Sequence, residues 1–162
     1  MQTRFLNRLG CCASLLMVLR ANPSPAQTLY FGAGIGPSIV LHQTAGAKTT
    51  YLGTYGVVGL EWPGHFGLRL EGTETYGFLW LSGDLVYTFT DHSSIVQPYS
   101  LAGFGFRTEL ANSAPIATIT TGFGVQGRLG AALSLFADGR VHHAFSSGGS
   151  VLLLTAGITL AP

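Results

Sequence analysis

Apolar side chains recur at every second position in about eight segments of the chain, each about ten residues long. In one of them Leu79, Leu81 and Leu85 alternate with small or polar side chains. A period of two residues indicates a β-strand with one apolar and one polar face. No stretch with helical periodicity is long enough to lie between these segments. The pattern therefore predicts an all-β fold.

The predicted strands have the length of strands that cross a lipid bilayer, about 9–11 residues. In lipid, only a closed sheet pairs every backbone group of a set of strands. Residues 27–162 supply 136 residues, or about 17 for each strand with its connection, which leaves no room for a second domain. We therefore predict one domain, an eight-stranded antiparallel up-and-down transmembrane β-barrel, with strands at residues 28–40, 49–62, 66–76, 79–89, 98–109, 117–129, 133–144 and 150–160.

Two short segments rich in glycine, proline and alanine are predicted to be tight turns at one end of the barrel, Pro63–His65 and Gly130–Ala132. Two predicted strands, 28–40 and 98–109, do not alternate cleanly. We explain each break by a β-bulge, with a shift in the assumed register as the alternative.

The first 26 residues have the pattern of a secretory signal peptide. Arg4 and Arg8 form a positive start, Leu9–Leu19 form a short apolar stretch, and residues 24–26 form a small-x-small cleavage site. The apolar stretch is too short for a membrane-spanning helix, which needs about 20 residues. We therefore divide the chain into a signal peptide, 1–26, and a barrel domain, 27–162.

Cysteine and charge exclude several classes of function for the barrel domain. Cys11 and Cys12 both lie in the leader, so residues 27–162 form neither a disulfide nor a thiolate metal site. That domain has five basic and seven acidic residues, a formal net charge of −2, with no basic patch. We therefore expect no nucleic-acid partner, no metal and no cofactor.

Most charged residues of the strands fall on the face opposite the leucines. An ionised side chain at the lipid midplane costs about 2–4 kcal/mol, so these residues are expected to point into the lumen. There, acids and arginines of neighbouring strands can pair and fill an interior that is just wide enough for side chains. We predict a lumen charge network, with an ion-conducting path as the alternative, made of Glu61, Arg69, Glu71, Asp84, Arg107, Glu109, Arg128, Asp138 and Arg140.

Aromatic residues cluster near the predicted strand ends, as in the aromatic girdles of membrane barrels. We therefore expect interfacial positions for Trp62, Tyr76, Trp80, Tyr87, Phe89, Tyr99 and Phe145.

The segment His142–Ser146 places histidines near a serine at a strand end, and a histidine there could activate the serine as a nucleophile. Barrel enzymes that deacylate lipid A carry such a pair, but the asparagine that follows their serine is replaced here by Ser147. Adjacent histidines of one strand point to opposite faces, which argues against a shared metal ion. We therefore expect no enzymatic activity.

The chain resembles the small outer-membrane β-barrels, the group of outer-membrane protein A, outer-membrane protein X and the opacity-type barrels. The likeness covers residues 28–160 and is carried by Gly56–Glu61, Leu68–Gly72, Pro98–Gly103 and Leu135–His142. It implies an eight-stranded barrel that the outer-membrane assembly machinery inserts, with no cofactor and usually no enzymatic activity.

Together these observations predict a monomeric barrel in the cell outer membrane of a diderm bacterium, in contact with outer-membrane lipid. The expected role is structural or surface-interacting. One alternative is a narrow channel for small solutes, which needs an open lumen. Another is a soluble exported, lipocalin-like binder of small apolar ligands, which needs leucines inside and polar residues outside.

Overall fold

The computed structural model describes residues 27–41, 50–91, 93–109, 114–145 and 149–161. It contains eight strands, as predicted, and their ends agree with the predicted ends within two residues. The strands are β1 (Thr28–Val40), β2 (Thr50–Glu61), β3 (Phe66–Thr75), β4 (Phe78–Thr88), β5 (Val96–Glu109), β6 (Ile116–Arg128), β7 (Leu133–Ala144) and β8 (Ser150–Leu160).

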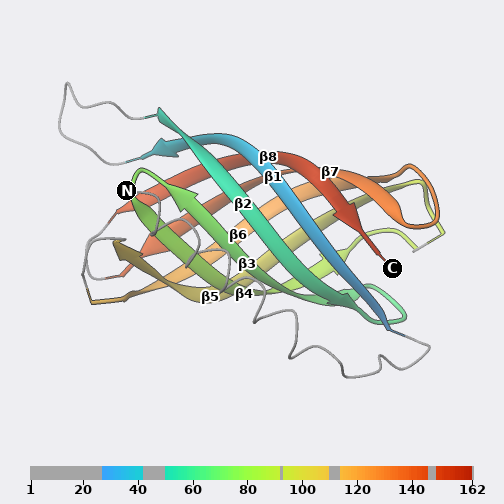
Figure 1. Cartoon of the computed structure of the whole chain (residues 1–162). Helices are drawn as coiled ribbons and strands as arrows, with labels where there is room; N and C mark the ends of the chain where they lie inside the picture. Colours follow the sequence, from blue (N-terminus) through green and yellow to red (C-terminus); the bar gives the residue numbers. More distant parts are fainter. Residues whose placement is uncertain (1–26, 42–49, 92, 110–113, 146–148, 162) are drawn as a thin grey trace, which may run out of the picture.

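The sheet is closed. Each strand pairs antiparallel with the next one along the chain, and β1 also pairs antiparallel with β8 (Figure 1). The prediction of a closed, eight-stranded up-and-down barrel is therefore confirmed. Among the described residues, no helix has the length and apolar character needed to span a membrane.

The barrel has two ends. Residues 62–65, 89–95 and 129–132 connect strands at one of them, which we call the turn end, and β1 begins and β8 finishes there. We call the opposite end the loop end. At the loop end β3 and β4 are joined by the two-residue turn Tyr76–Gly77. Both residues have positive φ, 51° and 77°, as a type I′ hairpin turn requires.

The tilt of the strands follows from the register. Stepping from partner to partner around the barrel from Tyr30 leads back to β1 ten residues further on, at Val40. With spacings of about 3.3 Å along a strand and about 4.8 Å between strands, this stagger gives a tilt of about 40°. The path runs through Gly59, Arg69, Asp84, Gly103, Thr120, His142 and Val151.

The two expected bulges are wrong. The described pairs of β5 with β4 and with β6 keep one register along their length, and so do those of β1 with β2. Between β1 and β8 the pairing is interrupted at Gly36 and Pro37, but it resumes in the same register. The irregular pattern of β5 has another cause, because the apolar Leu101 is buried in the lumen while Phe104 is exposed on the outside.

The outer wall of the barrel is apolar and the lumen is largely polar. Arg140 and Asp84, for example, are fully buried inside, among many threonines and serines. The exposed large side chains of the outer wall include Ile35, Leu52, Leu68, Leu70, Leu85, Phe104, Phe106, Phe123, Leu135, Leu154 and Ile158.

Candidate functional site

Four charged side chains meet at mid-height in the lumen. Arg69 and Glu71 come from β3, and Asp138 and Arg140 come from β7, which is four steps away in the ring of eight strands and so on the opposite wall. Arg69 Nε lies 3.1 Å from Glu71 Oε1, and Arg69 Nη2 lies 3.7 Å from Asp138 Oδ2. Arg140 pairs with both carboxylates. We call these four residues the cross-lumen cluster, because their ion pairs join the two walls.

Two tyrosines complete the cluster. Tyr55 Oη donates a hydrogen bond to Glu71 Oε1 at 3.1 Å, and Tyr99 Oη donates one to Asp138 Oδ2 at 2.7 Å. The guanidinium of Arg140 also lies over the Tyr55 ring, 4.3 Å from its centroid. Each carboxylate is thus held by arginine and by a hydroxyl, as a buried charge requires. The arrangement is suited to closing and stiffening the lumen.

Asp84 lies in the lumen apart from this cluster. It is fully buried on β4, and Ser82 Oγ donates a hydrogen bond of 2.9 Å to its Oδ2. Among the described residues it forms no ion pair. The alternation along β4 therefore predicts that Asp84 points into the lumen, but it does not predict which residue Asp84 contacts there.

The other four charged residues of the predicted network lie toward the barrel ends. At the loop end, the Arg107 guanidinium lies 4.8 Å from the centroid of the Phe78 ring, and Glu109 is exposed. At the turn end, Glu61 and Arg128 line a cavity. The structure thus distributes the nine residues along the whole lumen instead of joining them in one network.

Two of the seven aromatic residues expected at the interfaces lie inside the barrel instead. Trp80 and Tyr99 are each 3% exposed, so the interfacial expectation is corrected for both. Trp80 lies on the same face of β4 as Ser82 and Asp84, so the alternation along the strand predicts a position in the lumen. The interfacial expectation relied instead on the proximity of Trp80 to the strand end. The remaining five lie near strand ends. Trp62 is half-buried, and Tyr87, Phe89 and Phe145 are exposed on the outer wall. Tyr76 is exposed in the turn between β3 and β4, where its ring centroid lies 4.1 Å from that of Tyr51.

Sequence reasoning missed three aromatic residues that fill the lumen beside the cluster. Tyr30, Tyr55 and Phe136 pack together with Val57 in one buried group. Tyr55 has the same parity on β2 as Glu61, which phase assigns to the lumen, so this position was open to prediction. That these residues meet depends on the register between strands.

The two adjacent histidines point to opposite faces. His142 is buried in the lumen, where its Nδ1 shares a hydrogen bond of 3.0 Å with Thr120 Oγ1. His143 shares one of 2.9 Å, from its Nδ1, with Ser150 Oγ. Ser146, the candidate nucleophile of this segment, lies outside the described residues. Within the described ranges, no three histidine, cysteine or acidic residues gather as metal ligands.

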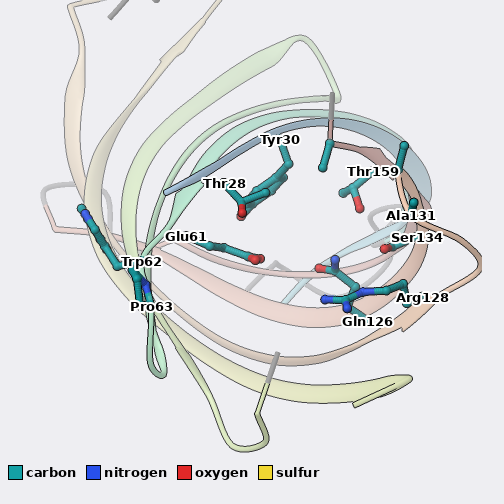
Figure 2. Close-up of a pocket in the computed structure, with 12 residues that line it drawn as sticks. Thr28, Tyr30, Glu61, Trp62, Pro63, Gln126, Arg128, Ala131, Ser134 and Thr159 are labelled. Atoms are coloured by element: carbon teal, nitrogen blue, oxygen red, sulfur yellow. The ribbon is translucent and has the colours of Figure 1, made fainter. Parts of the chain in front are cut away.

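A cavity of about 350 Å³ opens at the turn end (Figure 2). Its lining is mostly polar, and the acidic Glu61 of β2 and the basic Arg128 of β6 belong to it. The complete lining is Thr28, Tyr30, Glu61, Trp62, Pro63, Gln126, Arg128, Ala131, Ala132, Ser134, Thr159 and Ala161.

No protein-family model matches the sequence, and no curated protein matches it either. Solved structures do match the fold. Neisserial surface protein A is 15% identical, with a TM-score of 0.64 over 82% of this chain and 96% of that one. The chain has the fold of the small outer-membrane β-barrels. The N-terminal β-barrel domain of Pseudomonas aeruginosa OprF gives the same identity and TM-score, over 85% of this chain and 98% of that one.

A third similar structure is Ail, the attachment invasion locus protein of Yersinia pestis, in complex with the heparin analogue sucrose octasulfate. It is 13% identical, with a TM-score of 0.61 over 84% of this chain and 99% of that one. At such identities the likeness establishes the architecture of the barrel.

Proposed function

We propose that this protein is a structural barrel of the bacterial outer membrane, with a lumen that the cross-lumen cluster keeps closed. The observation that carries the proposal is the distribution of side chains across the wall. Leucine and phenylalanine cover the outside, while arginines and acids pair inside.

The outer wall supports insertion into lipid. Phe104 and Phe123 are 70% and 71% exposed near the middle of their strands, and Leu52 is 71% exposed near the loop end of β2. Soluble proteins rarely expose contiguous apolar surface on this scale, because its contact with water is unfavourable. In a bilayer, lipid covers the same surface, and the charged side chains of the lumen stay out of contact with hydrocarbon.

A soluble, lipocalin-like binder of apolar ligands requires the opposite arrangement. Its ligand would need an apolar interior, but the interior at mid-height contains Arg69, Glu71, Asp138 and Arg140. The orientation of the side chains therefore favours the membrane role over this alternative.

A narrow channel is the second candidate function, and the cross-lumen cluster argues against it. An ion that passes through the lumen must separate ion pairs that join β3 to β7, and each charge left without its partner is costly. We therefore assign the cluster to mechanical closure of the barrel. The proposed role is non-enzymatic.

Export and assembly complete the proposal. We assign residues 1–26, which lie outside the described residues, to an export signal, and insertion as a monomer to the outer-membrane assembly machinery. The partners proposed at the membrane are the lipids that surround the outer wall.

Cell fractionation tests the proposal. The full chain, expressed in a diderm host, is expected in the outer-membrane fraction, extractable only by detergent. Its band is expected to migrate differently on a gel with and without heating, because a closed barrel resists unfolding. Recovery in the soluble periplasm would contradict the membrane role.

A further inference from the structure

The cavity at the turn end has a feature that mechanical closure of the barrel does not need, namely opposite charges on facing walls. Glu61 lies at the end of β2 and Arg128 at the end of β6, four steps apart in the ring of eight strands. Both side chains reach into the cavity from opposite sides, and Gln126 lies beside Arg128 (Figure 2). We propose that this cavity binds a small zwitterion of the α-amino acid class.

The size of the cavity suits such a ligand. Its volume of about 350 Å³ lies at the lower end of the range of small-molecule pockets, which is about 300–1,000 Å³. Its inner end is closed, because Tyr30 of the lining packs against Tyr55, Val57 and Phe136. This aromatic layer lies between the cavity and the cross-lumen cluster. A ligand that enters from the turn end therefore stays there and does not pass through.

Arg128 supplies the site for the carboxylate. Within the part of the chain that the structure describes, its guanidinium makes no hydrogen bond and no ion pair. A guanidinium presents a planar fork of N–H donors that matches a carboxylate in bidentate geometry. The neighbouring Gln126 adds an amide that can donate to the same carboxylate.

Glu61 supplies the site for the ammonium group on the opposite wall. The hydroxyls of Thr28, Ser134 and Thr159 also line the cavity and offer further hydrogen-bond partners. A ligand with a carboxylate alone meets the repulsion of Glu61, and one with an ammonium group alone meets that of Arg128. The pair of charges therefore selects a molecule that carries both.

Binding to the full chain refolded in detergent micelles tests the inference. The probes are L-alanine, N-acetyl-L-alanine, which lacks the ammonium charge, and L-alaninamide, which lacks the carboxylate. L-alanine is expected to shift the backbone amide signals of Glu61, Arg128 and Ser134 in NMR spectra. Each derivative is expected to bind about tenfold more weakly, since it loses one charged hydrogen-bonding group.

Two variants separate the roles of the charges. In Arg128→Gln, L-alanine is expected to bind no better than L-alaninamide, which lacks the carboxylate. In Glu61→Gln, L-alanine is expected to bind no better than N-acetyl-L-alanine, which lacks the ammonium charge. Arg107→Gln, a matched removal of an arginine at the loop end, is expected to bind like the wild type. If Arg128→Gln does not refold, Arg128→Lys replaces it, because lysine keeps the positive charge but lacks the planar set of N–H donors of the guanidinium.

The inference is overturned if L-alanine causes no shifts, or if the three probes bind equally well. It is also overturned if refolded variants keep the wild-type preferences. Because the experiment is done in micelles and reports on one end of the lumen, its outcome is independent of whether the barrel resides in the outer membrane.

Discussion

At the scale of single residues, the lumen is organised by charges that face each other across the barrel. Arg140 is the centre of this arrangement, because it is fully buried and pairs with both Glu71 and Asp138 while its guanidinium lies over the Tyr55 ring. Removing one member of a buried ion pair leaves its partner's charge without compensation, which is more costly than losing the attraction alone.

Arg140→Met is therefore expected to lower the free energy of unfolding by about 3–5 kcal/mol. Methionine is of similar length, so the change removes the charge while retaining much of the side-chain volume. Urea unfolding in lipid vesicles measures the effect. The matched control is Arg128→Met at the exposed turn end, where the expected change is within about 0.5 kcal/mol. Equal midpoints for both variants would contradict the role of the cluster.

The alternation along each strand predicted the face of Arg69, Glu71, Asp138 and Arg140, but it could not predict that these four meet. Which residues share a height depends on the stagger between strands, and this is set by pairings between segments far apart in the chain. The same limit explains why Trp80 was assigned to an interface on its position near a strand end, although its phase on β4 places it inside.

At the scale of strands, β1 shows how backbones approach each other closely in this barrel. A Cβ atom added at Gly36 would lie 1.7 Å from the carbonyl oxygen of Leu154 on β8, so only glycine fits there without a backbone shift. Pro37 follows directly, and the β1–β8 pairing is interrupted at these two residues. The loss of apolar alternation at this point indicates a local irregularity in the strand, but one that leaves the register unchanged.

Gly36→Ala is therefore expected to destabilise the barrel by about 1–3 kcal/mol, because the methyl group forces β1 and β8 apart. Gly56→Ala is the control, since a Cβ atom at Gly56 has nothing within 4 Å. The control is expected to be neutral or slightly stabilising, because alanine restricts the unfolded chain. Both are measured by urea unfolding in vesicles, and an equal effect of the two substitutions would refute the contact.

At the scale of the whole molecule, the outer wall and the lumen differ in the kind of environment that each requires. The alternation in the sequence was sufficient to predict the eight strands, their closure and the side that faces outward. It was insufficient for the two ends, where lipid, water and lumen meet and residues such as Glu61 and Trp62 have mixed surroundings.

The depth of a charge on the outer wall tests the membrane environment directly. Leu70 lies half-exposed at the middle of β3, and Phe66 is equally exposed at its start, near the turn end. In lipid vesicles, Leu70→Arg is expected to cost about 2–4 kcal/mol and Phe66→Arg about 0–1 kcal/mol. Unfolding titrations measure both. A soluble barrel would show no such dependence on depth.

Closure of the lumen is tested by electrical recording. The protein refolded into a planar bilayer is expected to show no steady conductance, because the cross-lumen cluster and the aromatic layer fill the interior. A variant with serine at positions 69, 71, 138 and 140 is the comparison, with its heat-dependent gel mobility as the check of folding. It is expected to show unitary current steps. Such steps in the wild type would favour the channel.

The partners of the cross-lumen cluster also bear on how such a barrel is made. Glu71 and Arg140 are separated by 69 positions in the chain, so they can meet only after β7 has curved round to face β3. Until then each strand carries only its own ion pair, Arg69 with Glu71 on β3 and Arg140 with Asp138 on β7, and the pairs that join the two walls are missing. The ion pairs across the lumen are thus completed late, when the sheet curves toward closure, so an incompletely wrapped barrel lacks the links that stiffen its interior.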